Sequence, residues 1–490
     1  MPKKFELYDL TKYFHNVRKE DGTLNPILGE DELALSSCLS YRLEDNNFVI
    51  KAYSGTGKTV IMDAIFALLP EEFYYVLEHL SETAVWYDAE KINRARFIAI
   101  PEAQKLPEPV IEVVKTWGDG RSAFRKRTDV TVGDTVETQI YPKYVFMCVA
   151  VENTKGASYF DAELERRCMI MHTNPTVKQT ERVVRHKLMD SAVPKTTLTT
   201  MSEEEIEGLK KHVLQAVVDR DDEEALVIKN PCAPFLFEAI PSAFPVSRSK
   251  VQYLLKVINA VARFYPDEIL KVEKDGTQYG LVTPKHNWLG LRIYLNSFVS
   301  ECLHMPSHGT DILKLFPDTR IDRFGFADGD TIRMSNNEIK KAAKAAGLPF
   351  TKIEPILGAL VMTGFLEMDE DKGKKLYYKS PLFEEPVSKI NWSGLIEETK
   401  DFMAKNWPAV AVEYGGRFCS DIKIVDPFTG DDIKLGERAK TAIDIETDAY
   451  EPFKTYKDSR IKSFEEFLLH AEGDYNEEEI ETVKSHYKES

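Results

Sequence analysis

The chain has 490 residues, of which 43% are hydrophobic, and it carries a formal net charge of −16. A chain of this length is expected to hold about two to four domains with hydrophobic cores of their own. Its acidity argues against a protein that coats nucleic acid over its whole surface, but it is compatible with a narrow basic channel.

Targeting and cysteine patterns narrow the class further. No apolar run reaches the length of a membrane span, and the N-terminus lacks a signal-peptide core. We therefore expect a soluble globular protein without a membrane partner, located in the cytoplasm, nucleoid or nucleus. The six cysteines are scattered without a Cys-x-x-Cys pair, which argues against a disulfide framework and a zinc ribbon.

The first residues lead into a helix. Residues 1–24 are polar and mixed, which predicts an arm or a short helix. After Asn25, Gly29 ends one segment, and acidic residues then open a helix that continues through Leu43. Leucines recur near helical spacing, so this helix is expected to pack on a sheet. These leucines are Leu33, Leu35, Leu39 and Leu43.

The run Phe48–Thr59 is the most informative stretch of the chain. It reads as a short apolar strand followed by a glycine-containing loop, and the helix-forming run Val60–Leu69 comes next. This is the pattern of a phosphate-binding loop, with Ala52 where the first glycine usually stands. Gly55 and Gly57 let backbone N–H groups turn toward phosphate oxygens, and the helix N-terminus adds partial positive charge.

The end of this loop supplies the expected ligands. Lys58 is expected to reach the β- and γ-phosphates, and Thr59 is expected to hold Mg²⁺. A glycine-rich turn that binds no nucleotide is the alternative. The predicted nucleotide-binding residues are Ser54, Gly55, Thr56, Gly57, Lys58 and Thr59.

A second strand ends near a carboxylate. The apolar run Phe97–Ile100 predicts a buried parallel strand, and Glu102 follows it. A nucleotide-hydrolysing site needs a carboxylate at this place, where Glu102 can polarise the attacking water. An ordinary surface glutamate is the alternative, which the upstream phosphate loop makes less attractive.

A basic segment follows. Pro109–Thr116 is amphipathic and predicts a helix, and the alternating stretch Asp129–Ile140, interrupted at Gly133 and Asp134, predicts a β-hairpin. Basic residues at one end of this hairpin suit contacts with nucleic-acid phosphates, with a solvated basic loop as the alternative. They are Arg121, Arg125, Lys126 and Arg127.

Two further strands carry polar residues at their ends. The run Tyr144–Val151 predicts a third buried strand, and the amide of Asn153 beyond it can orient the lytic water. Arg166 and Arg167 stand just before a fourth apolar strand. In oligomeric ATPases such an arginine reaches the neighbouring subunit's γ-phosphate and stabilises the transition state. Taken alone, the two arginines suggest a surface ion pair.

The order of these motifs resembles the AAA+ ATPases. More narrowly, it is similar to the ATPase module of the minichromosome maintenance (MCM) helicases and their relatives on viruses and mobile elements. Asn25–Leu33 resembles the family's entry segment, and Pro101–Leu106 resembles its Walker B segment. Leu164–Ile170 is similar to the segment with the arginine finger, which falls on Arg166. The resemblance covers residues 25–265, roughly half the chain.

The resemblance extends to a helical lid. Pro245–Arg263 predicts a capped amphipathic helix with one apolar face. Arg248 near its start matches the family's second sensor arginine, which contacts the γ-phosphate. Without the resemblance, an arginine at a helix start would be taken as a surface residue. The apolar face contains Val251, Leu254, Leu255, Ile258 and Val261.

The sequence departs from the MCM pattern in three ways. Pro101 replaces the Walker B aspartate that orders water around Mg²⁺, so either Glu102 covers part of that role or hydrolysis is slow. The stretch between Pro70 and Arg94 is too short for the family's helix-2 insertion, so one DNA-gripping loop looks reduced. Residues 1–24 leave no room for the MCM N-terminal DNA-binding and zinc domain, which we expect to be missing.

The last third predicts smaller modules. A hairpin around Asp275 and Gly276 precedes a helix from about His286 to Leu303. From Ser335, two short helices and a wing around residues 371–373 predict a winged-helix domain, which could bind DNA or a protein partner. The lysines available for DNA phosphates are Lys340, Lys341, Lys344 and Lys352.

The predicted fold is therefore α/β. We expect a AAA+ P-loop core with a parallel sheet between helices, a helical lid, a winged-helix domain and a small C-terminal α+β extension. The expected boundaries are 1–24 for the arm, 25–175 for the ATPase core, 176–330 for the lid and connecting segment, 331–385 for the winged helix, 386–470 for the extension and 471–490 for an acidic tail.

The resemblance implies an ATP-driven, ring-forming DNA helicase or translocase, as in the replication of a virus, plasmid or integrated element. Its cofactors would be ATP and Mg²⁺. Its partners would be a single DNA strand in a central channel, five further copies in a hexamer, and replication proteins at the C-terminal third. Two alternatives stay open: an AAA+ nucleotide switch without unwinding activity, acting as initiator, loader or remodeller, and a degenerate ATPase that serves as a protein-binding scaffold.

Overall fold

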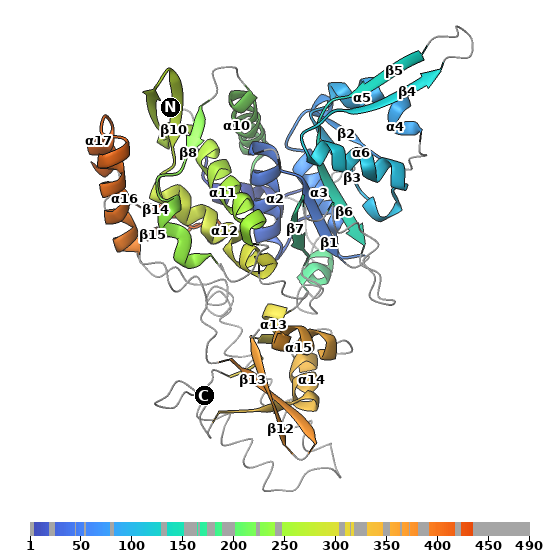
Figure 1. Cartoon of the computed structure of the whole chain (residues 1–490), viewed down its shortest axis with the longest axis vertical. Helices are drawn as coiled ribbons and strands as arrows, with labels where there is room; N and C mark the ends of the chain where they lie inside the picture. The colour runs from blue at the N-terminus through green and yellow to red at the C-terminus, as the bar shows by residue number, and fades with distance from the viewer. Residues whose placement is uncertain are drawn as a thin grey trace. The chain divides into compact units, whose positions relative to one another are not determined.

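The computed structural model describes most of the chain as far as residue 434 (Figure 1). Within the described ranges, no helix is both long and apolar enough to cross a bilayer. These ranges are 4–18, 25–44, 46–52, 55–78, 83–128, 135–150, 164, 167–173, 182–188, 201–221, 226–240, 247–302, 309–313, 315–317, 331–345, 353–362, 365–371, 373–380, 392–416 and 423–434.

A five-stranded parallel sheet lies between helices and forms the centre of the α/β region (Figure 1). All neighbouring strands run parallel, and β1 lies between β6 and β7. In sheet order the strands are β2 (Tyr74–Val76), β3 (Phe97–Ile100), β6 (Tyr144–Ala150), β1 (Phe48–Ala52) and β7 (Met169–His172). This arrangement is compatible with a P-loop fold.

The inner strands follow from their sequences. All four residues of β3 are buried, as are the five central residues of β6. Strands covered on both faces need continuous apolar runs, so the predicted second, third and fourth strands are confirmed. At the edge of the sheet, the order of elements differs from that of the inner strands. Here β2 comes first, followed by α4 (Ala84–Tyr87) and α5 (Ala89–Arg94).

Helices cover the sheet with two different kinds of contact. On one side, Val114 and Trp117 of α6 (Glu108–Gly118) join a buried cluster with the strands. On another, Tyr41 of α2 (Asp31–Leu43) packs its ring against Phe97 and Phe146. The Tyr41 hydroxyl donates to the Ile98 carbonyl at 3.0 Å. The leucines predicted to face inward from α2 are all buried.

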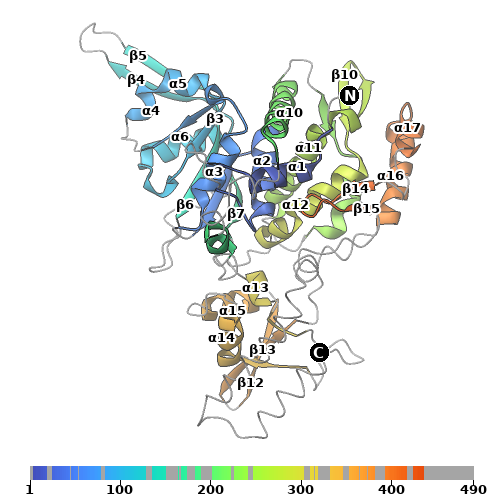
Figure 2. The ribbon, with the colours of Figure 1, turned by 180° about the vertical axis from the view of Figure 1, so that it is seen from behind.

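An antiparallel hairpin extends past α5, as Figures 1 and 2 show. Its strands are β4 (Ala123–Thr128) and β5 (Thr135–Ile140), so the predicted hairpin exists but its first strand begins earlier than the alternating stretch. The basic residues therefore lie along β4 and just before it, rather than at one end. At the base, Asn93 of α5 donates to the Gln139 carbonyl at 2.8 Å and accepts from the Tyr141 N–H.

Helices α11 (Ser247–Phe264) and α12 (Pro284–Cys302) form the centre of a second, largely helical body. Their backbones approach closely at Gly290, where a Cβ would lie 2.6 Å from Ile258 Cγ1. The predicted lid helix is thus confirmed as a helix. Of its predicted apolar face, Leu254, Ile258 and Val261 are fully buried. The helices α1 (Leu7–His15) and α10 (Glu203–Asp221), together with α2, belong to the same body.

A small sheet accompanies these helices. Its order is β8 (Val227–Lys229), β10 (Thr277–Leu281) and β9 (Leu270–Lys274). Asp275 and Gly276 both have positive φ, 53° and 74°, as a two-residue hairpin turn requires. The predicted hairpin is confirmed at this turn.

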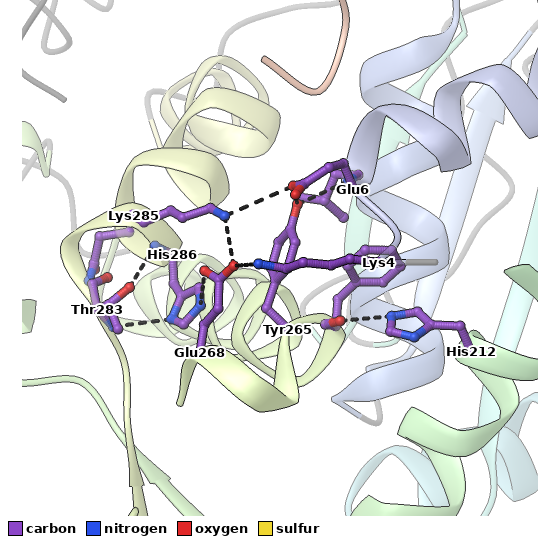
Figure 3. A network of polar contacts seen from close by, with 11 residues as sticks. Lys4, Glu6, His212, Tyr265, Glu268, Thr283, Lys285 and His286 are labelled. Atoms are coloured by element: carbon purple, nitrogen blue, oxygen red, sulfur yellow. Dashed lines mark hydrogen bonds and ion pairs between the residues drawn. The ribbon is translucent and has the colours of Figure 1, made fainter. Parts of the chain in front are cut away.

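Polar contacts join the start of the chain to this body (Figure 3). The Tyr265 hydroxyl donates to Glu6 at 2.9 Å and accepts from the Leu7 N–H. Lys285 donates to Glu268 at 3.0 Å and lies over the Tyr265 ring. The segment expected to be an arm or short helix therefore contains a helix whose inner face is buried.

Residues 331–380 contain two helices beside a three-stranded antiparallel sheet. The two helices and two of the strands match the sequence prediction, and the third strand was not predicted. Gly373, with φ of 77°, lies in the turn of the wing. Lys340 pairs with Glu354 at 2.8 Å, and Lys352 lies outside the described residues. The elements are α14 (Asn336–Ala345), α15 (Ile353–Met362), β11 (Met334–Ser335), β12 (Leu366–Asp371) and β13 (Lys374–Lys379), preceded by α13 (Gly309–Leu313).

The described part of the C-terminal extension contains helices and a hairpin, as expected. They are α16 (Trp392–Asn406), α17 (Ala411–Gly416), β14 (Lys423–Val425) and β15 (Asp432–Lys434). We call residues 423–434 the terminal hairpin. Its Asp426 accepts from Arg292 Nε of α12 at 3.0 Å, and the Pro427 carbonyl accepts from the Thr11 hydroxyl of α1 at 2.6 Å. The terminal hairpin is thus attached to the helical body.

Candidate nucleotide-binding site

The loop between β1 and α3 (Lys58–Phe66) contains two glycines with left-handed backbone conformation. Gly55 and Gly57 have φ of 82° and 88°, a region that residues with a Cβ rarely adopt. Apart from the adjoining residues, no atom of the described residues lies within 4 Å of a Cβ built at either glycine, so their backbone conformation is what requires glycine. Ser54 lies outside the described residues.

The start of α3 favours an anion. Gly57 is its N-cap, and the first turn contains no acidic residue. The first N–H groups of a helix lack partners within the helix and carry partial positive charge. Thr59 is exposed in this turn, and its hydroxyl is available to a metal ion that accompanies a nucleotide. A helix start of this kind favours a bound anion such as a phosphate group.

Lys58 lies between a strand end and two other groups of the site. Its ammonium donates to the Ala52 carbonyl at 3.3 Å. Burial lowers the pKa of Lys58, while the neighbouring Cys148 and Glu102 act to raise it. Burial also raises the pKa of Cys148 to about 12, so this thiol stays neutral beneath the loop. Lys58 starts the helix that follows β1 and Glu102 follows β3, so both residues lie at the same end of the parallel sheet.

Glu102 follows β3 at the start of a short 3-10 turn, η2 (Ala103–Lys105). Its side chain is 47% exposed, and Oε2 lies 2.6 Å from Lys105 Nζ. In the same turn, Gln104 Oε1 accepts from the Ala150 N–H at 3.2 Å. That contact ties the Glu102 turn to the end of β6, the strand that the sequence continues toward Asn153. Asn153 itself lies outside the described residues.

The end of β7 is also joined to the loop. The hydroxyls of Thr173 and Thr56 lie 3.0 Å apart. Sequence reasoning missed Thr173 because 117 positions separate the pair. It also missed Lys105, although a spacing of three residues from Glu102 was a usable signal. The structure thus brings Thr56, Lys58 and Glu102 to the carboxyl edge of one sheet, where parallel α/β sheets bind ligands.

The predicted arginines have different surroundings. Arg248 is exposed in the first turn of α11, which has no acidic residue. The helix dipole opposes a cation there, so a nearby anion would be favoured. Arg166 lies outside the described residues, but its neighbour Arg167 donates from Nε to Asp119 at 2.6 Å. Arg167 and Arg121 together lower the pKa of Asp119 to about 2. Arg167 is therefore committed to an ion pair.

The basic residues of the hairpin are partly neutralised. Arg121 pairs with Asp119 at 2.6 Å, and Lys126 lies 3.6 Å from Glu137 on the opposite strand. Arg125 is half-buried, and the side chain of Arg127 lies outside the described residues. Phe124, which sequence reasoning missed, is 57% exposed and shares a strand face with Lys126. An exposed aromatic beside a cation suits the stacking of an unpaired base.

Two described residues could accompany a magnesium ion that arrives with a nucleotide. No group of three or more His, Cys, Asp or Glu side chains gathers at metal-binding distance within the described ranges. A nucleotide brings its own phosphate ligands, and the Thr59 hydroxyl with the Glu102 carboxylate nearby suits such an ion. Pro101, at the position of the missing aspartate, supplies no ligand.

Comparisons with known proteins add no further assignment. No protein-family model matches the chain, and no curated protein sequence is significantly similar to it. Functional inference therefore depends on the residues of this chain and on their geometry.

Proposed function

We propose that the protein is an ATPase of AAA+ type that assembles into a ring and translocates on DNA, as MCM-like replicative helicases do. One observation carries the proposal: Gly55 and Gly57 adopt positive φ between the end of β1 and a helix that starts with Lys58. The neighbouring Glu102 supplies the carboxylate that hydrolysis needs.

In the proposed reaction, the loop N–H groups and Lys58 bind the phosphates, and Thr59 holds the Mg²⁺ that accompanies them. The metal, when bound, supplies electrostatic stabilisation of the transferred phosphoryl group. Glu102 accepts a proton from the attacking water, and Asn153 orients that water through its amide. Because Glu102 pairs with Lys105, the carboxylate has to release this contact or share it with the water.

Two arginines complete the proposed site. Arg166 acts across a subunit boundary, and Arg248 contacts the γ-phosphate from the lid. Arg248 is supported by its exposed place in a helix turn without acidic residues. Arg167 is paired with Asp119, so Arg166 is the remaining arginine of the two for contact with the γ-phosphate. A finger acting in trans requires an oligomer, and we propose six subunits.

The β4–β5 hairpin is the proposed DNA-gripping element. It carries Arg125, Lys126 and Arg127, with Phe124 exposed between Ala123 and Arg125. Phosphate contacts from such cations bind a strand without reading its sequence. The helices and wing of residues 331–380 are then a winged-helix domain that contacts DNA or replication proteins.

The test is steady-state ATPase activity with and without single-stranded DNA. We expect wild-type turnover to rise with DNA, and the triple variant Arg125→Ala, Lys126→Ala and Arg127→Ala to lose this stimulation but keep basal turnover. Lys91→Ala with Arg94→Ala is the matched control, because these exposed cations lie on the adjacent α5. Equal stimulation in both variants would contradict the role of the hairpin.

A nucleotide switch without unwinding is the second candidate, and two observations favour it. Pro101 replaces a metal-ordering aspartate, and the Glu102 carboxylate is paired with Lys105. Both favour slow hydrolysis, which a switch tolerates. ATP-dependent DNA binding without strand displacement on forked DNA would support the switch, whereas ATP-dependent displacement that Glu102→Gln abolishes would support the helicase.

A further inference from the structure

The edge strand β7 is covered by two charged side chains of the helical body. On its inner side, the Met169 N–H donates to the Asn47 carbonyl at 2.9 Å, next to β1. Because a strand's backbone groups alternate in direction, the Cys168 carbonyl and the Ile170 N–H point to the outer side. Groups at a sheet edge that lack a neighbouring strand need water or another partner.

Lys250 and Glu301 provide these partners. Lys250 Nζ donates to the Cys168 carbonyl at 3.0 Å, and the Ile170 N–H donates to Glu301 Oε1 at 3.0 Å. The two side chains pair at 2.7 Å and are only 6% and 12% exposed. Tyr294 of α12 donates a further hydrogen bond to Glu301. We call Lys250 and Glu301 the edge clamp.

The edge clamp joins two segments that the proposed function assigns to phosphate chemistry. Cys168 follows Arg167 directly, and Arg167 is fixed at its other side by Asp119. Lys250 lies two residues after Arg248, so the two Cα atoms are within about 7 Å of each other. The clamp therefore fixes the start of β7, just after the arginine pair, against the first turn of the lid helix.

A buried ion pair adds little stability compared with an apolar contact at the same place. Desolvation of two charges offsets most of their attraction, and apolar side chains of similar volume are often as stable. Unlike an apolar contact, the pair forms directional hydrogen bonds, because each side chain here bonds one particular backbone group. That property sets a register between strand and helix, which an apolar contact would leave adjustable.

We propose that Lys250 and Glu301 are positioning residues: they hold the start of β7, directly after Arg167, in register with the lid helix, so that this subunit completes its neighbour's nucleotide site. This inference rests on the proposed function. Neither side chain is assigned a contact with nucleotide. Loss of the clamp should therefore impair the site that the subunit completes and leave its own phosphate loop intact.

The test uses the full chain with the double substitution Lys250→Met and Glu301→Gln, which removes both charges together. We expect ATP affinity and KM to stay within twofold of wild type and kcat to fall at least tenfold. Mixing these subunits with Lys58→Ala subunits should restore part of the turnover. In such mixtures, the phosphate loop of a clamp variant can lie next to a Lys58→Ala subunit, whose clamp is intact. A variant that is merely misfolded would not be rescued in this way.

Arg263→Met is the matched control. Arg263 belongs to the same helix and pairs with Glu44 at 2.6 Å, with both side chains similarly buried, but Glu44 ends α2 and not β7. This variant should keep wild-type kcat. If the double variant unfolds, the nearly isosteric single substitution Glu301→Gln takes its place. The conservative substitution Lys250→Arg keeps the positive charge and should retain most of the wild-type turnover.

The possible outcomes separate the two proposals. If the wild-type chain hydrolyses ATP and the clamp variants match it, or fall without rescue by Lys58→Ala subunits, the clamp is overturned while the ATPase stands. If the wild-type chain neither binds nor hydrolyses ATP, the proposed function fails, and the clamp proposal fails with it.

Discussion

The edge of the parallel sheet with the candidate nucleotide site and the helical body are built in different ways. At the sheet edge, the loop shape comes from residues that are close in sequence, namely Gly55, Gly57 and Lys58. In the helical body, polar contacts join residues far apart, such as Thr11 with Pro427 and Arg292 with Asp426. The comparison teaches that the residues of the candidate loop come from one short stretch of sequence. The helical body, by contrast, depends on polar pairs between residues far apart in the chain.

If the two regions are separable, a site substitution should remove chemistry without affecting stability. Lys58→Ala should lower ATP turnover by about three orders of magnitude, because the loop loses the cation that meets the phosphates. Its unfolding temperature should stay near that of wild type, since Lys58 is only half-buried and its ammonium donates to the Ala52 carbonyl, which is near in sequence. A parallel loss of stability, measured by calorimetry, would break the comparison.

The converse substitution should affect stability and spare the site. Arg292→Met leaves Asp426 buried without its cation, which costs about 3 kcal/mol of unfolding free energy. This is the lower end for such a loss, because the Phe428 and Thr429 N–H groups still donate to Asp426.

Chemical denaturation measures this effect, and a second ion pair of the terminal hairpin provides the control. Lys423 lies 3.5 Å from Asp432, but both side chains are exposed, so Lys423→Met should cost less than about 1 kcal/mol. Equal costs for Arg292→Met and Lys423→Met would show that the terminal hairpin is not anchored through α12.

Acid should weaken the helical body through His286. This ring is fully buried, its Nδ1 accepts from the Thr283 N–H, and burial lowers its pKa to about 3 (Figure 3). Between that value and the unfolded pKa of about 6.5, the unfolded chain binds more protons, so stability falls as pH falls. At pH 5 the loss is about 2 kcal/mol relative to pH 7.

The substitution His286→Asn isolates this effect, because an amide oxygen can still accept from Thr283 but does not titrate. Denaturation curves between pH 5 and pH 7 should then be about 2 kcal/mol less pH-dependent than those of wild type. An unchanged pH dependence would show that other groups dominate the acid response.

The smallest predicted effect concerns a long-range contact at the candidate nucleotide site. Thr173→Val removes the hydroxyl that lies 3.0 Å from the Thr56 hydroxyl. A neutral hydrogen bond contributes about 1 kcal/mol, so ATP should bind roughly fivefold more weakly if this contact preorganises the loop. Fluorescent nucleotide titration measures the change, and unchanged affinity would mean that the loop is shaped by its glycines alone.

Sequence patterns revealed the elements whose physics is local. The strands that begin at Phe97 and Tyr144 are apolar runs because helices cover both of their faces. The Asp275-Gly276 dipeptide is typical of a turn with positive φ, and the structure has positive φ at both residues. By contrast, β2 could not be located from the sequence, because three partly exposed residues at a sheet edge have no distinctive hydrophobic pattern.

Other features could not be predicted because their determinants lie elsewhere in the chain. The first hairpin strand was displaced because Arg125, Lys126 and Arg127 do not alternate as a half-buried strand does. Lys250 in a helix start looks like a surface residue until Glu301 and the edge of β7 are seen beside it. Motifs thus predicted the candidate phosphate loop and Glu102, but not the contacts that hold them in place.

The most direct test of the central claim is ATP turnover by the purified oligomer, measured with and without single-stranded DNA and compared with Lys58→Ala. The account predicts turnover that DNA stimulates and that Lys58→Ala abolishes. A wild-type monomer that neither binds nor hydrolyses ATP would contradict it.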